Sequence, residues 1–463
     1  MIAPRIALRG DLLDFVAAPA RADRDSPAVR WRPDHWLLVE GTRIVGAQAV
    51  APDVTWRRVD HAGKLILPGF VDTHVHSPQL DVIGSWGAQL LDWLRDYTFP
   101  AEARLADPPV ARQVSQFFLD ALLAHGTTSA VVFPTVQKAS ADALFAAAQQ
   151  RGMRLVTGKV LMDRHAPPGL SDDVEGAEAD CLELIERWHG QGRLAYALTP
   201  RFAPTSSEAQ LAMAGRLLAS RDGLYMQTHV AENRDEVRWV AELFPKARSY
   251  LDVYERFGLL NARAVLAHGI WLDDADRALL RERGAQIAHS PSSNLFLGSG
   301  LFGWAAAEDA GVHISLASDV GGGTSLSMQR TMADAYKVQA MAGTRLSAWA
   351  LLHAATRGAA TALAVAAGGG IPSGDVAWAA AGTTGRCGTG PIGVGAVGST
   401  CLMVGFCGAG PLGVPGVPGV EPGSVGAGAG GCSPGSGGSL GGPSNAHATA
   451  KADAPIIGTR AAL

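Results

Sequence analysis

The sequence is poor in cysteine and has no excess of positive charge. Of its five Cys in 463 residues, Cys181 alone lies within the first 380 positions. The paired cysteines of a disulfide framework or a zinc ribbon are therefore absent. The formal net charge is −4, which excludes a protein that binds nucleic acid by neutralising a run of phosphates.

Long apolar runs are missing as well. Arg5, Arg9 and Asp11 interrupt the N-terminal stretch in which a secretory signal would be uncharged. No uncharged apolar stretch of membrane-spanning length precedes residue 363. Hydrophobic residues still make up 47% of the chain, enough to bury a large core. We therefore expect a cytoplasmic protein with no membrane partner.

The composition changes abruptly near residue 364. Residues 364–463 hold 28 of the 56 Gly, 9 of the 26 Pro and only six charged residues. A segment of this low-complexity composition loses much backbone entropy when it becomes ordered, and it has few large apolar side chains to bury. We divide the chain into a small β-layer (1–64), an α/β domain (65–363) and a Gly/Pro-rich segment (364–463). We expect the last to be poorly packed and to have no catalytic role.

Short apolar runs alternate with amphipathic segments between residues 65 and 363. The runs lack a period of two, as strands buried on both faces do. Eight strand–helix repeats within ~260 residues are what a TIM-like (β/α)8 barrel requires, and this is the fold we expect. A doubly wound open sheet would show the same alternation. The predicted strands are 65–71, 129–135, 155–162, 194–200, 224–230, 264–270, 285–290 and 313–319, and the clearest helices are Pro109–His125, Ser206–Ser220, Arg234–Glu242 and Asp273–Arg283.

Ionisable residues recur where the predicted strands end. His74 and His76 follow the first strand at a spacing that lets both imidazoles face one metal ion. His229, His268 and Asp319 end three later strands, at the face where barrel active sites are built. Three imidazoles and a carboxylate suit Zn²⁺ or a similar first-row divalent ion. This distribution predicts a metal site.

Glu232 lies three residues beyond His229, in the sequence HVAE. From there its carboxylate would reach a metal-bound water without ligating the metal. Single members of the set have structural alternatives: His268 could be a hydrogen-bonded core histidine, and Asp319 could cap the Gly-rich turn that follows it. Five such residues at matching strand ends favour the metal site.

Several motifs occur in the order and at the separations found in known enzymes. They are PGFVDTHVH (68–76), HVHSPQ (74–79), LLDWLRDYTFPAE (90–102), TPRFAP (199–204), HVAE (229–232), LAHG (266–269), SPSSNLFLGSGLF (290–302) and SLASDVGGG (315–323). In these motifs the chain resembles the amidohydrolase superfamily of metal-dependent barrel hydrolases and, within it, the guanine deaminase family. The resemblance covers roughly residues 60–363, and the cytidine-deaminase zinc signature is absent.

This resemblance implies one Zn²⁺ per chain, with His74, His76, His229 and Asp319 as its ligands. Asp319 would also act in catalysis, by taking a proton from the attacking water. The implied reaction is the hydrolytic deamination of guanine, a small purine, to xanthine and ammonia. The implied assembly is a homodimer.

The resemblance also assigns roles beside the metal. Glu232 would be the proton shuttle. His268 would orient the water or polarise the intermediate, and both His268 and His229 would border the substrate.

Three further residues match positions that hold the purine. The amide of Gln79 offers a donor and an acceptor, and the guanidinium of Arg201 offers a planar fork. The ring of Phe202 would pack against the base. Without the resemblance, a salt-bridged barrel arginine and a core phenylalanine would be the simpler interpretation. Trp86 and Trp93 lie in the loop after the first strand and are candidates for the pocket wall.

The C-terminal segment departs from the family pattern. Family members continue with a charged stretch that returns strands to the N-terminal β-layer, so residues 1–64 are expected to have lost sheet partners. A frameshift near codon 364 and a genuine segment both remain open explanations, as does a barrel that has become catalytically impaired. A related aminated heterocycle, such as 8-oxoguanine, a pterin or an aminotriazine, is the alternative substrate.

Overall fold

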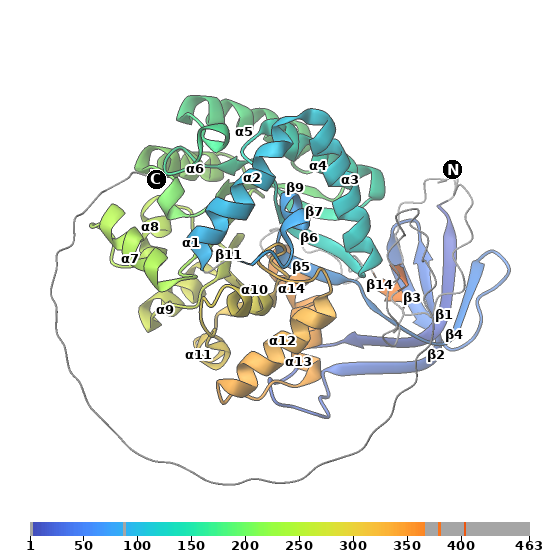
Figure 1. The fold of residues 1–463 in the computed structure, drawn as a ribbon. Coiled ribbons are helices and arrows are strands. Elements are labelled where there is room, and N and C mark those ends of the chain that lie inside the picture. Colours follow the sequence, from blue (N-terminus) through green and yellow to red (C-terminus); the bar gives the residue numbers. More distant parts are fainter. Residues whose placement is uncertain (1–2, 87–88, 366–377, 381–401, 404–463) are drawn as a thin grey trace, which may run out of the picture. The chain divides into compact units, whose positions relative to one another are not determined.

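The computed structural model describes residues 3–86, 89–365, 378–380 and 402–403. Within them, an N-terminal sheet is followed by a barrel of strands with helices on its outside (Figure 1). No helix in these ranges is long and apolar enough to cross a membrane. Most of the predicted segment 364–463 lies outside the described residues, so its poor packing and lack of a catalytic role stay predictions.

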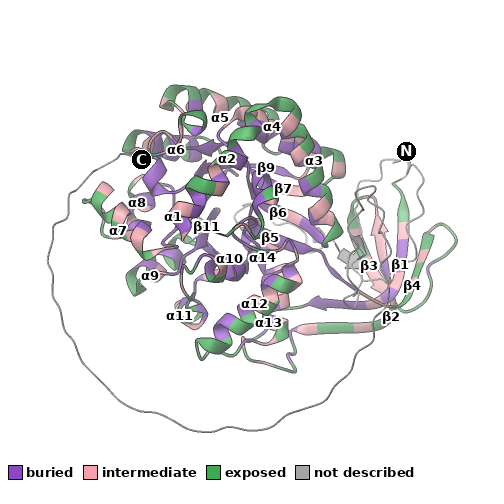
Figure 2. Cartoon of the chain, viewed as in Figure 1, coloured by how far each residue is buried: buried purple, intermediate pink, exposed green. Residues whose placement is uncertain are grey.

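Eight parallel strands form the barrel, in the order β13-β12-β11-β10-β9-β7-β6-β5. The strands are buried along most of their length (Figure 2). Two backbone hydrogen bonds join the first strand to the segment directly after the last one: Asp319 N–H donates to the His74 carbonyl and His76 N–H to the Val320 carbonyl, both at 2.9 Å. The (β/α)8 barrel is thereby confirmed, and the open sheet is excluded. The strands are β5 (Phe70–His76), β6 (Thr127–Phe133), β7 (Arg154–Thr157), β9 (Leu194–Pro200), β10 (Tyr225–Val230), β11 (Ala264–His268), β12 (Gln286–His289) and β13 (His313–Leu316), with β8 (Val160–Leu161) paired to β9.

Helices follow the barrel strands, and several of them begin at a capping side chain. Asn233 and Asp273 each cap a helix through a reciprocal capping box, and Gly284 ends the second of these helices in the left-handed conformation. All four helices predicted from amphipathic periodicity are present, with ends shifted by at most two residues. The helices are α1 (Leu90–Trp93), α2 (Phe99–Ala103), α3 (Pro108–Ala124), α4 (Lys138–Arg151), α5 (Val174–Trp188), α6 (Glu208–Ser220), α7 (Arg234–Leu243), α8 (Tyr250–Arg256), α9 (Asp274–Arg283), α10 (Pro291–Phe296), α11 (Trp304–Asp309), α12 (Met328–Met341), α13 (Ala348–Ala354) and α14 (Arg357–Val365), with short helical turns η1 (Ser77–Val82), η2 (Leu94–Thr98), η3 (Arg104–Ala106), η4 (Pro168–Leu170) and η5 (Ala203–Thr205) between them.

The N-terminal sheet has its own small apolar core. Leu8, Leu12, Leu37 and Ile66 pack together in it. Its strands are β1 (Arg5–Phe15), β2 (Val29–Glu40), β3 (Arg43–Gln48), β4 (Arg57–Pro68), β14 (Trp378–Ala380) and β15 (Leu402–Met403), in the order β15-β14-β4-β1-β2-β3.

Two expectations about this sheet were wrong. The sheet has not lost its partners, because β14, from the C-terminal segment, pairs antiparallel with β4. The predicted strand 65–71 is in fact two strands, since β4 continues to Pro68 and the barrel begins at Phe70. Gly69 separates them, and a Cβ there would lie 2.2 Å from the hydroxyl of Thr128. The change of sheet therefore falls beyond the predicted division after residue 64, and the HxH lies within a strand rather than after it.

Candidate metal centre and active site

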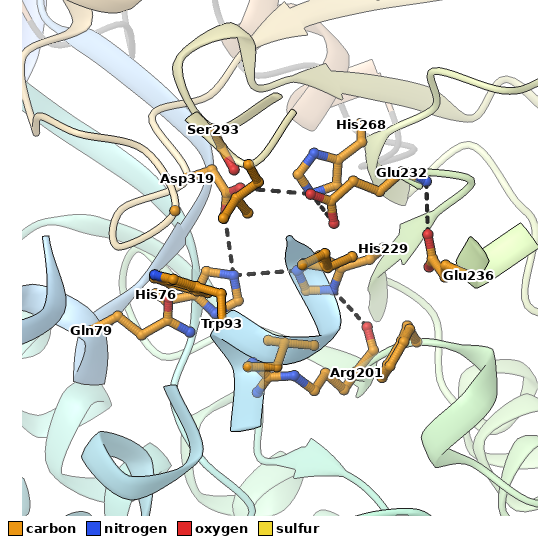
Figure 3. A pocket seen from close by; sticks show the side chains of 15 residues that line it. His76, Gln79, Trp93, Arg201, His229, Glu232, Glu236, His268, Ser293 and Asp319 are labelled. Atoms are coloured by element: carbon orange, nitrogen blue, oxygen red, sulfur yellow. Dashed lines mark hydrogen bonds and ion pairs between the residues drawn. The ribbon is translucent and has the colours of Figure 1, made fainter. Parts of the chain in front are cut away.

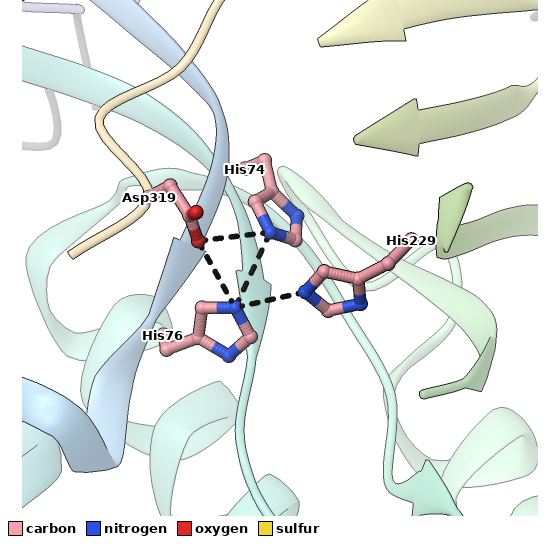
Figure 4. Close-up of side chains that lie close together, drawn as sticks. All are labelled: His74, His76, His229 and Asp319. Atoms are coloured by element: carbon pink, nitrogen blue, oxygen red, sulfur yellow. Dashed lines mark hydrogen bonds and ion pairs between the residues drawn. The ribbon is translucent and has the colours of Figure 1, made fainter. Parts of the chain in front are cut away.

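Four side chains converge at the C-terminal ends of the barrel strands. His74 and His76 project from β5, His229 from β10, and Asp319 follows β13 (Figure 4). One ligand atom from each lies within 4.8 Å of the other three. Nε2 of His74 and Nε2 of His76 lie 3.1 and 3.2 Å from Asp319 Oδ1, and Nε2 of His229 lies 3.3 Å from Nε2 of His76.

This donor set fits a divalent metal ion such as Zn²⁺. Ligands at zinc-bond lengths in a tetrahedron are about 3.3 Å apart, close to the spacings found here. Nδ1 of His229 lies 2.7 Å from the Arg201 carbonyl and donates to it, which leaves the Nε2 lone pair facing the cluster. Burial lowers the pKa of His76 to about 3 and that of His229 well below its usual value. Both rings are therefore neutral, as metal ligation requires.

The backbone around the cluster adopts an uncommon conformation. Among the described residues, five that are not glycine have a positive φ, and three of these lie in the site: Ala231 (48°), His268 (70°) and Asp319 (49°). Such conformations cost free energy and persist where the surrounding structure holds them. The chain thus turns sharply after β10 and β11, and again just beyond β13.

Glu232 and His268 face each other beside the cluster. Oε2 of Glu232 lies 3.4 Å from Nε2 of His268, and Asp319 Oδ2 lies 3.6 Å from the same nitrogen. The other ring nitrogen, Nδ1, is 2.8 Å from the Asn294 amide oxygen, to which it donates. Ser299 donates to Glu232 Oε1 at 3.1 Å. Burial, together with the charge of Asp319, raises the pKa of Glu232 to about 8.

A second carboxylate, Glu236, lies directly behind Glu232. Its Oε2 accepts hydrogen bonds from the backbone N–H groups of Glu232 and Asn233, at 2.9 and 3.0 Å. Its Oε1 accepts one from the Tyr250 hydroxyl at 2.7 Å. Burial, with the nearby charge of Glu232 adding to it, raises the pKa of Glu236 to about 7.

The predicted purine-holding residues meet at the opposite wall. Gln79, on η1, accepts a hydrogen bond from the Gly321 N–H at 3.0 Å and donates one to Glu102 at 2.9 Å. Arg201, directly after β9, pairs with the same Glu102. Arg201 is therefore salt-bridged, as the simpler interpretation predicted. Both Arg201 and Phe202 also line the pocket.

These walls border one pocket beside the ligand cluster (Figure 3). Trp93 lines it and donates its indole N–H to the Ser85 carbonyl at 3.0 Å. Trp86 is 77% exposed and is not among the lining residues, so this candidate for the wall was wrong. The pocket is lined by His76, Gln79, Leu90, Trp93, Leu94, Arg201, Phe202, His229, Glu232, Glu236, His268, Ser293, Leu297, Asp319 and Gly322.

Sequence reasoning missed several residues that hold the site together. Asp72 accepts hydrogen bonds from the backbone and hydroxyl of Ser318, which ties β5 to the segment that carries Asp319. Glu236 had a readable signal, because it stands three residues after Asn233 in a capping-box pattern. Glu102 lay inside a quoted motif, but its two partners are 23 and 99 positions away.

The fold and this site define a metal-dependent barrel hydrolase. The model of the amidohydrolase family matches residues 65–381, more than half of the chain. The chain belongs to the amidohydrolase family. The match begins before the barrel and extends beyond residue 363, where the composition changes.

Known relatives agree with this assignment. The chain is 44% identical over 363 residues to the guanine deaminase of Escherichia coli K12, covering 77% of this chain and 82% of that one. The structure of the E. coli guanine deaminase gives a TM-score of 0.74, over 77% of this chain and 84% of that one. The guanine deaminase of Bradyrhizobium japonicum gives 0.78 at 32% identity, over 82% and 88%. That of C. acetobutylicum, solved with bound guanine in the active site, gives 0.75 at 26% identity, over 81% and 90%.

Proposed function

We propose that this chain is a zinc-dependent hydrolase that deaminates guanine to xanthine and ammonia. One observation carries the proposal: three of the four residues in the ligand cluster, the Glu232–His268 pair and the Gln79–Arg201 wall all border a single pocket. The similarity to guanine deaminases over most of the chain supports the same substrate.

The metal ligands in this proposal are His74, His76, His229 and Asp319. A zinc ion held by them would lower the pKa of a water toward ~7 and so supply a nucleophile at neutral pH. Carbon C2 of guanine is the electron-poor centre that such a nucleophile would attack, and the carboxylate of Asp319 would take the water's proton as the new C–O bond forms.

Glu232 acts as the proton shuttle. Burial raises the pKa of its carboxyl group, so the group is suited to hold and release a proton near neutral pH. It delivers a proton to ring nitrogen N3. The proton that Asp319 took from the water then passes to the departing amine, and the new C2 hydroxyl returns a proton to Glu232 as the carbonyl forms. General acid–base catalysis of this kind contributes roughly 10²–10⁴-fold. His268 is fixed by Asn294 with Nε2 toward the pocket, where it borders the substrate and polarises the intermediate.

The far edge of the base binds to Gln79 and Arg201, and Phe202 packs against the ring. The amide of Gln79 provides a donor and an acceptor, while Arg201 provides donors for the O6 carbonyl. His229 borders the substrate on the metal side.

The proposal extends to the whole protein. We infer a homodimer in the cytoplasm from the family resemblance, and light scattering of the purified protein would measure the assembly. We also retain the division into an N-terminal β-layer, a barrel and a Gly/Pro-rich segment, with catalysis confined to the barrel.

A substrate panel tests the activity. Purified protein is incubated with guanine, 8-oxoguanine, a pterin and an aminotriazine, and ammonia release is followed. The proposal expects release from guanine at the highest kcat/KM. Release from an analogue but not from guanine would overturn the substrate and leave the chemistry standing, whereas no release from any compound in metal-loaded protein would indicate an impaired barrel.

A further inference from the structure

Glu102 joins the two polar residues that face the proposed base. Its side chain is fully buried in α2. Oε1 accepts hydrogen bonds from Gln79 Nε2 at 2.9 Å and from Arg201 Nη1 at 2.8 Å. Oε2 accepts a hydrogen bond from the same Nη1 of Arg201 at 2.7 Å. One carboxylate therefore links η1, α2 and the end of β9.

These contacts leave Gln79 with one amide orientation. Its oxygen accepts from the Gly321 N–H, and its nitrogen donates to Glu102. Reversing the amide would place a donor against a donor and an acceptor against an acceptor. In the orientation that remains, one N–H and one oxygen lone pair of Gln79 are available to a ligand.

Glu102 also fixes Arg201 by charge. Both side chains are buried, with exposed fractions of 3% for Arg201 and 0% for Glu102. A buried guanidinium without this partner would be left uncompensated. The guanidinium carbon also lies 5.3 Å from the centre of the Phe99 ring, so the carboxylate and the ring together restrict it.

Glu102 itself does not line the pocket, although both of its partners do. We propose that Glu102 is a positioning residue for recognition of the base. It holds the Gln79 amide and the Arg201 guanidinium together as one preformed surface for a ring edge that carries a carbonyl and an adjacent N–H. This inference rests on the proposed function and deepens it, because it concerns how the same site selects its substrate.

A double-mutant cycle tests this role through Gln79. Glu102→Gln, Gln79→Leu and the double variant are compared with the parent protein for kcat and KM on guanine. Glu102→Gln should lower kcat/KM by about 10- to 100-fold, the range for hydrogen bonds to a charged group, and mainly by raising KM. In the Gln79→Leu background, Glu102→Gln should lower kcat/KM by a smaller factor, because the surface that Glu102 positions has already lost Gln79.

Two controls separate positioning from folding. Glu102→Asp keeps the negative charge beside Arg201 but shortens the side chain, so it should fold, keep its metal and still show a raised KM. Glu255→Gln is the matched control. Glu255 pairs with Arg283 at the surface, with exposed fractions of 24% and 39%, and its loss should leave KM unchanged.

Binding of xanthine, followed by tryptophan fluorescence, gives the same cycle without turnover. A parent protein that binds xanthine but does not deaminate guanine would overturn the proposed function alone, and the cycle on xanthine affinity would still decide the role of Glu102. A parent that binds neither compound would overturn both. Two results would overturn the positioning role. The first is a parent KM in folded, metal-loaded Glu102 variants. The second is a double variant whose loss in kcat/KM or xanthine affinity equals the product of the two single losses.

Discussion

The backbone N–H of Glu232 donates a hydrogen bond to the buried carboxylate of Glu236 at 2.9 Å. The residue proposed to move protons is thus held by a second acid that is also the N3 residue of the α7 capping box. Tyr250 donates to the other oxygen of Glu236. The start of α7 and the carboxyl of the proposed proton shuttle are therefore fixed by the same group, which makes Glu236 a direct point for experiment.

Glu236 should make stability depend on pH. Its pKa in the folded chain is raised to about 7, compared with 4.5 for an unperturbed carboxyl. Between these values the folded chain binds the proton and the unfolded chain does not, so the free energy of unfolding falls as pH rises from about 4.5 to about 7. From about pH 5 to pH 8, the parent should lose on the order of 2–3 kcal/mol relative to Glu236→Gln.

Urea unfolding of both metal-free proteins at the two pH values would measure this difference. Removal of the metal keeps the pH dependence of metal binding out of the comparison. An equal pH dependence in the parent and the variant would show that Glu236 titrates normally.

Metal content should depend on His229. The purified protein should contain about one divalent ion per chain, with zinc the best match to the ligands. His229→Ala removes a ligand and should abolish both metal binding and activity. Elemental analysis measures the metal, and a chelator followed by added Zn²⁺ should remove and restore activity in the parent. Full activity in metal-free protein would contradict the site.

Glu232→Gln should separate chemistry from metal binding. The variant should fold normally and keep its metal but lose several orders of magnitude in kcat, because the amide cannot donate and accept the transferred proton. Parallel elemental analysis and steady-state kinetics measure both properties. Metal loss in this variant would instead make Glu232 a ligand.

A buried ion pair away from the metal should matter for folding. Lys159 is fully buried, and its ammonium group lies 2.7 and 2.8 Å from the two carboxylate oxygens of Asp172. Asp172→Asn leaves that charge unpaired and should cost about 3–5 kcal/mol of stability. Glu255→Gln, at the surface, should cost about 0–1 kcal/mol. Chemical unfolding measures both, and equal costs would contradict the assignment.

The barrel could be predicted because its strands are continuous apolar runs and several of its helices are amphipathic and carry caps that are visible locally. The metal ligands could be predicted for a related reason. All four ligands lie within three residues of a strand end, and the fold brings such ends together. The boundary at Gly69 could not be seen, because LILPGFV is one apolar run although it serves two sheets.

Contacts between segments that are distant along the chain could not be predicted from the sequence. Glu102 is 99 positions from Arg201, and Asp72 is 246 positions from Ser318. No local period links such pairs. The pairing of β14 with β4 was missed for another reason, since composition alone gave the C-terminal segment no strand signal.

The central claim is that this site adds water to C2 of guanine. The direct measurement is turnover of guanine in ¹⁸O-labelled water, with mass analysis of the product and assay of ammonia. The proposal predicts xanthine that carries one ¹⁸O atom, one ammonia released per xanthine, and no product from His229→Ala. Failure of the metal-loaded protein to turn over guanine, or xanthine formed without the label, would contradict it.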